Sequence, residues 1–137
     1  MKIFNEIKQL VRTEKLYTAK ILTKLMIVEK DKLYSDLKYS SLHKYIIKEL
    51  GYSEAESTIR LNAVRLMLKS TKAKKQIENG TLTLTNAAEA NKVIQQNKNP
   101  ALIDRIVDQA GKTSTRKFKE TIAKEFGQNR REVLILQ

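Results

Sequence analysis

Helix-breaking residues are scarce in this chain of 137 residues, which contains four glycines and a single proline. Residues that favour helices, such as Leu, Ile, Lys, Glu and Ala, fill much of the remainder. The glycines stand alone at positions 51, 80, 111 and 127, and each is expected to end a helix. The sequence therefore predicts an all-α fold, a compact bundle of about six helices that begins with a long one.

Apolar residues recurring at helical spacing, together with capping residues, place the expected elements. Ser53 and Glu56 form an S-x-x-E capping box, and Asn99-Pro100 marks another helix start. The expected helices are a long one over 5–32, a short one from Ser40 or Ser41 to Leu50, then 53–70, 72–79, one after the connector 81–85, one over 100–110 ending at Gly111, and one from Thr113 or Ser114 to Gly127.

The helices are expected to form a single domain over residues 1–127, followed by an apolar tail over 128–137. The tail carries four consecutive apolar residues, Val133, Leu134, Ile135 and Leu136. Because such a run is unfavourable in water, we expect it to pack back on the domain or to pair with another chain as an edge strand. The tail thus makes another protein or a second copy of this chain an expected partner.

Charge narrows the range of partners. The chain has 27 Lys and Arg against 15 Asp and Glu, a net charge of +12. Such an excess attracts polyanions, of which DNA is the expected one and RNA the alternative. A merely solubilising basic surface is the competing interpretation. The cations are spread over many elements, which fits DNA better than an anionic membrane. No signal peptide or membrane-spanning run is apparent, so we expect a cytoplasmic protein without a membrane partner.

The segment 41–69 has the layout of a helix-turn-helix unit, with a short helix, a turn at Gly51 and a second, capped helix. The second helix is apolar on two sides, which indicates a central helix packed between neighbours. Helix-turn-helix units usually carry an aliphatic residue six positions after the turn glycine, where this chain has Ser57. An ordinary αα-hairpin is therefore the alternative to a DNA-reading unit.

A polar stripe runs along the second helix at the spacing i, i+4, i+7, i+11. Its members are Thr58, Asn62, Arg65 and Lys69. Hydroxyl, amide and cationic groups on one side of a helix are suited to phosphate and base contacts. Any central helix must also leave one side in water, so a plain solvated face is the alternative interpretation of the stripe.

Residue patterns for catalysis or metal binding are missing from the sequence. The chain has no cysteine, which excludes disulfides and thiolate zinc sites. It has one histidine, His43. The glycines form no phosphate-binding loop. We therefore expect no enzyme activity, no catalytic residue, no metal and no cofactor, and we expect His43 to be a surface or partly packed residue of the short helix.

The run L-G-Y-S-E-A-E-S-T-I-R-L-N-A-V-R-L at 50–66 is followed by N-G-T-L-T-L-T-N-A-A at 79–88 and G-K-T-S-T-R-K-F-K-E at 111–120. In this order the segments resemble the helical domain found N-terminal to HNH endonuclease modules in bacterial proteins. They are more weakly similar to the helix-turn-helix region of ParB-type partition proteins. The His, Asn and Cys ligands of an HNH module are absent here, so the resemblance implies an accessory domain without the nuclease.

Together these observations predict a nucleic-acid-binding helical domain, an accessory or DNA-targeting module. The alternative is a protein-interaction or oligomerisation domain with a solubilising basic surface. The candidate nucleic-acid-binding residues combine the polar stripe with basic residues of the third matching segment: Thr58, Asn62, Arg65, Lys69, Lys112, Arg116 and Lys119.

Overall fold

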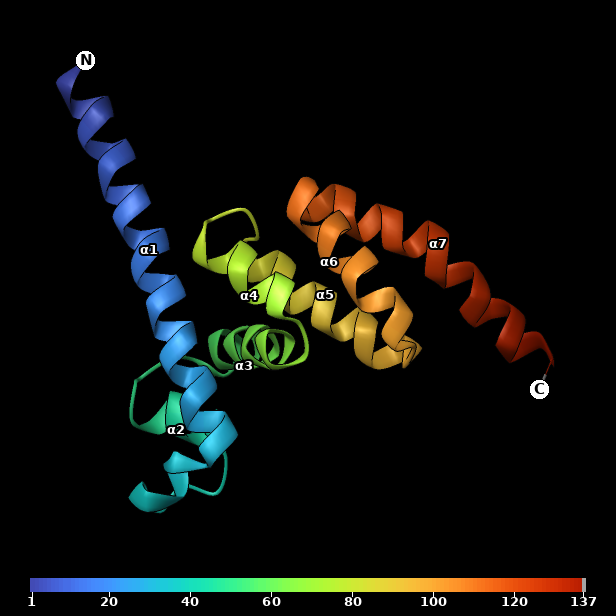
Figure 1. The fold of residues 1–137 in the computed structure, drawn as a ribbon, viewed down its shortest axis with the longest axis horizontal. Helices are drawn as coiled ribbons and strands as arrows, with labels where there is room; N and C mark the ends of the chain where they lie inside the picture. Colours follow the sequence, from blue (N-terminus) through green and yellow to red (C-terminus); the bar gives the residue numbers. More distant parts are fainter. Residues whose placement is uncertain (137) are drawn as a thin grey trace.

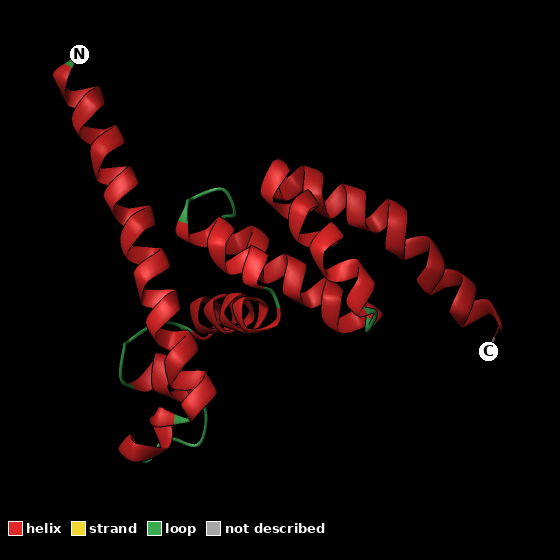
Figure 2. Ribbon diagram, in the orientation of Figure 1, coloured by secondary structure: helices red, strands yellow, loops and turns green. Residues whose placement is uncertain are grey.

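The fold is entirely helical in the computed structural model, which describes the backbone of residues 1–136 and the side chains of residues 1–125 (Figures 1 and 2). No strand occurs in that part of the chain, so the predicted all-α class is confirmed. The elements are α1 (Lys2–Asp31), η1 (Leu33–Leu37), α2 (Leu42–Lys48), α3 (Glu54–Lys69), α4 (Thr71–Glu78), α5 (Leu84–Asn97), η2 (Pro100–Leu102), α6 (Ile103–Lys112) and α7 (Thr115–Leu136).

Side-chain caps set the starts of α2 and α3 where the sequence predicted them. The Ser41 hydroxyl accepts a hydrogen bond from the Lys44 amide at the start of α2. At α3 the Ser53 hydroxyl accepts from the Glu56 amide, and the Glu56 carboxylate accepts from the Ser53 amide, which confirms the capping box. The hydrogen bond from the Ser53 backbone also lowers the pKa of Glu56.

Two glycines end helices as predicted, because only glycine adopts a left-handed backbone without steric strain. Gly51 has a φ of 80° after α2, and Gly80 has a φ of 83° after α4. Lysines take the same conformation at the ends of two other helices, where no glycine marks the helix end: Lys32 after α1 and Lys98 after α5.

The predicted helix end at Gly111 is wrong, because α6 continues through Gly111 to Lys112. The glycine there allows a close approach between helices. A Cβ atom at this position would lie 2.6 Å from the side-chain oxygen of Gln76 on α4. Gly111 therefore permits close packing between helices and does not form a turn.

The predicted helix end at Gly127 is also wrong. The backbone of α7 is helical from Thr115 to Leu136, since a glycine inside a helix costs only about 1 kcal/mol relative to alanine and need not end it. The stretch 128–136 is thus helical and is not the suggested edge strand. What the side chains of Val133 to Leu136 contact lies outside the described residues.

The centre of the bundle is α3, which contacts α1, α2, α4 and α5. Its buried side chains point to more than one side, and Ala63, Val64 and Leu66 are fully enclosed. The prediction of a central helix, apolar on two sides, is confirmed. Small residues on α5, among them Ala87 and Ala90, are also fully buried and suit a close packing of α5 on α3.

The outer helices extend from this centre. α6 and α7 pack on α5, and α1 packs on α3 and α4. Figure 1 shows the N-terminal half of α1 and the distal part of α7 projecting away from the packed body. Across the described residues, no helix has the length and apolar character needed to cross a membrane.

Candidate nucleic-acid interface

The four stripe residues of α3 share one side of the helix but differ in exposure. Thr58, Arg65 and Lys69 are exposed, whereas Asn62 is buried. The Thr58 hydroxyl donates to the Glu54 carbonyl within the same helix. The stripe is therefore not a continuous solvated face, and Asn62 is not available to an external ligand.

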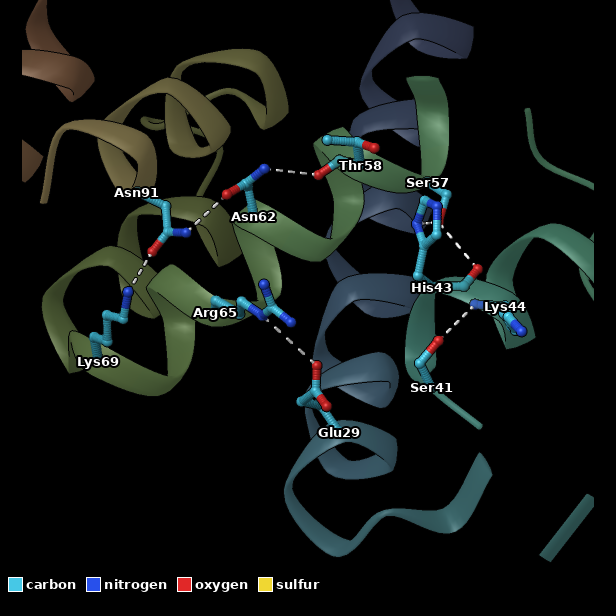
Figure 3. A network of polar contacts seen from close by, with 10 residues as sticks. All are labelled: Glu29, Ser41, His43, Lys44, Ser57, Thr58, Asn62, Arg65, Lys69 and Asn91. Atoms are coloured by element: carbon cyan, nitrogen blue, oxygen red, sulfur yellow. Dashed lines mark hydrogen bonds and ion pairs between the residues drawn. The ribbon is translucent and has the colours of Figure 1, made fainter. Parts of the chain in front are cut away.

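Asn62 belongs to a chain of hydrogen bonds that joins α3 to α5 (Figure 3). Its amide nitrogen donates to the Thr58 carbonyl at 3.0 Å, and its amide oxygen accepts from the Asn91 nitrogen at 2.9 Å. The Asn91 oxygen in turn accepts from the Lys69 ammonium at 2.9 Å. Asn91 is fully buried, so its amide depends on these two partners.

Sequence reasoning missed Asn91. Its only sequence signal is an amide among the alanines of A-A-E-A-N, at a position where the helix period calls for an apolar residue. The structure shows that this amide holds Lys69 in place, which the stripe spacing on α3 alone could not indicate.

Arg65 turns toward α1. Its Nε lies 4.0 Å from Oε2 of Glu29, an oxygen that is buried and makes no hydrogen bond. The arginine side chain is 47% exposed, so one side faces this carboxylate and the other faces water. Arg65 therefore combines an ion pair within the fold with an accessible guanidinium (Figure 3).

Lys69 borders an open hollow of about 470 Å³ at the ends of α3 and α5. Lys98 lines the same hollow, with the amide side chains of Gln95 and Asn99 and an apolar floor that includes Ile94 and Ile103. No acidic residue lines it within the described part of the chain. Partial burial, and then the nearby Arg65 charge, lower the pKa of Lys69, as expected of a cation without a neighbouring carboxylate.

The other three predicted residues lie elsewhere, at the junction of α6 and α7. Lys112, Arg116 and Lys119 are exposed. Arg116 pairs with Glu120 at 3.4 Å, and Lys119 lies 3.9 Å from Glu89 of α5. These basic residues therefore form a separate group from Arg65 and Lys69 on α3.

Asn86 of α5 fastens this junction from inside. Its nitrogen donates to the carbonyls of Ala110 and Thr113, at 2.9 and 2.8 Å. Its oxygen accepts from the Thr115 hydroxyl at 2.6 Å. One buried amide thus supplies hydrogen-bond partners to groups at the end of α6 and at the start of α7. It thereby positions the segment that carries Lys112 and Arg116.

The segment predicted as a helix-turn-helix unit folds as α2, a turn at Gly51 and α3. Ser57, which replaces the usual aliphatic residue, is fully buried, and its hydroxyl lies 2.8 Å from Nδ1 of His43 and 3.3 Å from the His43 carbonyl. His43 is partly buried, as expected, and it satisfies the buried hydroxyl. The exposed first turn of α3 carries Glu54 and Glu56, which would repel phosphates near this end.

The contact between Ser57 and His43 gives a first prediction. Ser57→Ala is expected to lower the free energy of unfolding by about 1 kcal/mol, because it removes a net hydrogen bond inside the α2–α3 packing. Urea unfolding followed by circular dichroism measures the change. In a double-mutant cycle with His43→Ala the two losses are expected to be less than additive. Fully additive losses would show that the two side chains do not interact.

Other ionisable groups form surface pairs. Asp108 accepts from Lys72 at 2.6 Å, and this hydrogen bond lowers the pKa of Asp108. In the described part of the chain no three His, Cys, Asp or Glu side chains gather into a group that would hold a metal ion.

No family model, curated protein or solved structure matches the chain.

Proposed function

We propose that this chain is a nucleic-acid-binding helical domain, an accessory or targeting module for DNA, with Lys69, Lys98 and Arg65 as its main phosphate contacts. The observation that carries the proposal is the hollow lined by Lys69 and Lys98, whose lining includes two cationic and two amide side chains and no described acidic residue. Phosphate oxygens accept hydrogen bonds from both kinds of group.

Preorganisation supports the same assignment. The Lys69 ammonium is already oriented by the buried Asn91 amide, so less side-chain freedom is lost when a phosphate binds. A phosphate would also supply the negative charge that this partly buried cation lacks. The proposal leaves Asn62 out, because it is buried, and includes no catalytic step.

The acidic first turn of α3 favours backbone contacts over base reading. In helix-turn-helix proteins the N-terminal residues of the second helix contact base edges. Here those positions include Glu54 and Glu56, so the proposed binding depends on phosphates and shows little sequence preference. The group of Lys112, Arg116 and Lys119 is proposed as a second, weaker phosphate contact.

Removing the two lysines of the hollow tests the proposal. Lys69→Gln combined with Lys98→Gln is expected to weaken binding to a short duplex about tenfold at low salt. It should also reduce the slope of log affinity against log salt by about two, one unit for each phosphate contact. Fluorescence anisotropy across a salt series measures both quantities.

The matched control is Lys92→Gln combined with Arg105→Gln. It removes the same two charges from exposed side chains that are paired with Glu89 and Glu125. It is expected to change affinity much less. Equal losses in the two variants would show that only net charge matters, and an absence of binding by the unmodified protein at low salt would contradict the proposed function itself.

A further inference from the structure

The N-terminal half of α1 presents a row of large apolar side chains to solvent. This row, called the N-terminal stripe, consists of Ile3, Phe4, Ile7, Leu10 and Val11, which are 55%, 58%, 50%, 69% and 42% exposed. Figure 1 shows this half of the helix standing clear of the other elements. Apolar side chains exposed side by side in this way mark an interaction surface.

The stripe continues a face that is buried further along the same helix. Phe4 and Leu22 are 18 residues apart, which is five full helical turns, so they lie on one line along α1, with Val11 close to it. Leu25 and its neighbour Leu22 are only 4% and 1% exposed, in the half of α1 that packs on the body. Residues 3–11 thus carry a core-type surface that the described part of the chain does not cover.

We propose that a second copy of this chain covers the N-terminal stripe, with the two α1 helices antiparallel over residues 2–14. The spacing of Ile3, Ile7 and Leu10 alternates by four and three residues, as in helices that pair along a seam. In an antiparallel overlap Ile7 lies opposite Leu10 of the second copy, and each copy contributes the same surface, as a two-fold interface requires.

The flanks of the stripe favour the antiparallel arrangement. Phe4 and Val11 lie on one flank, whereas Glu6 and Thr13 lie on the other. Antiparallel helices bring like flanks together, so Phe4 packs beside Val11 of the second copy. A parallel pair would instead place the apolar flank of one copy against Glu6 of the other.

Charge distribution favours the same orientation. Glu14 is exposed and lies on the line of the stripe, about one helical turn beyond Leu10. Parallel helices would place the two Glu14 carboxylates opposite each other. In the antiparallel overlap Glu14 instead reaches the end of the second helix, beside Lys2, where an ion pair can form.

The exposed apolar area of the N-terminal stripe is sufficient for a weak dimer. Half-exposed side chains of this size present on the order of 500 Å² of apolar surface in each copy, so pairing would bury about 1,000 Å² in total, near the lower limit for a specific interface. We therefore expect a dimer that dissociates in the micromolar range. This inference is independent of the nucleic-acid proposal, since the stripe and the lysine hollow lie on different parts of the molecule.

Sedimentation velocity of the full chain over a range of concentrations tests the inference. The unmodified protein is expected to pass from monomer to dimer, and Leu10→Glu is expected to raise the dissociation constant at least tenfold. The control, Leu37→Glu, changes a 55% exposed leucine of η1 and should leave the dimer intact. A protein that stays monomeric throughout, or equal effects of the two variants, would overturn the proposal.

Engineered cysteines test the orientation, since the natural chain contains none. When Ile7→Cys and Leu10→Cys proteins are mixed and oxidised, the disulfide is expected between the two different variants. Cross-linking of each variant only to itself would overturn the antiparallel arrangement. Binding to vesicles of phosphatidylglycerol and phosphatidylcholine, lost in Leu10→Glu while the protein in solution is monomeric, would assign the stripe to a membrane and refute the dimer.

Discussion

Replacing Phe118 with alanine is expected to lower the free energy of unfolding by about 3–5 kcal/mol, the usual range for a phenylalanine truncated in a core. Among the residues whose side chains the structure describes, Phe118 is the largest that is fully enclosed, and it is only 1% exposed. It lies in the first turn of α7, next to the junction that Asn86 fastens by hydrogen bonds. Its loss leaves a cavity where α7 meets the core.

Urea unfolding followed by circular dichroism measures this loss. Phe118→Leu, which retains most of the apolar volume, is expected to cost clearly less than the alanine variant. The control Ile122→Ala, one turn further along α7 and only partly buried, is also expected to have a smaller effect. A change below 1 kcal/mol for Phe118→Ala would show that α7 is not anchored through this side chain.

Replacing Asn91 with leucine is expected to lower the free energy of unfolding by about 2–3 kcal/mol, although the two side chains are similar in size. The leucine leaves the buried Asn62 oxygen without its donor and deprives the Lys69 ammonium of its acceptor. A buried polar group that loses its partner carries the full penalty of its desolvation.

The double variant Asn62→Leu with Asn91→Leu distinguishes lost hydrogen bonds from overpacking as the cause of the lower stability. When both partners of a buried hydrogen bond become apolar, the change in stability can be nearly neutral. The double variant should therefore be more stable than Asn91→Leu alone. A control at the exposed Gln95, changed to leucine, should stay within about 0.5 kcal/mol of the unmodified protein. A double variant that is less stable than the single one would indicate steric strain.

The sequence allowed the helix starts to be predicted better than the helix ends. Capping is local chemistry, so Ser41, Ser53 and Glu56 identify their helices without knowledge of the rest of the fold. A glycine is ambiguous, because its lack of a side chain serves a turn at Gly51 and a close helix approach at Gly111. Only the position of Gln76 in space distinguishes the two uses.

For the candidate site, the sequence could not show which of the predicted side chains are exposed. Helical periodicity correctly placed Thr58, Asn62, Arg65 and Lys69 on one side of α3. It did not reveal that α5 covers the middle of that side, because the donor to Asn62 comes from a residue 29 positions away. Lys98, which shares the hollow with Lys69, escaped notice for the same reason.

The hydrogen bonds of Asn91 have a consequence for how uniquely the chain is folded. Alanines on α5 and aliphatic side chains on α3 would tolerate a shift of one helix along the other, since apolar contacts have little directional preference. The Asn91 amide finds both of its partners in a single alignment only, and a shift of one turn would bury it without them. A core built mostly from small and aliphatic residues thereby acquires a fixed register between its two central helices.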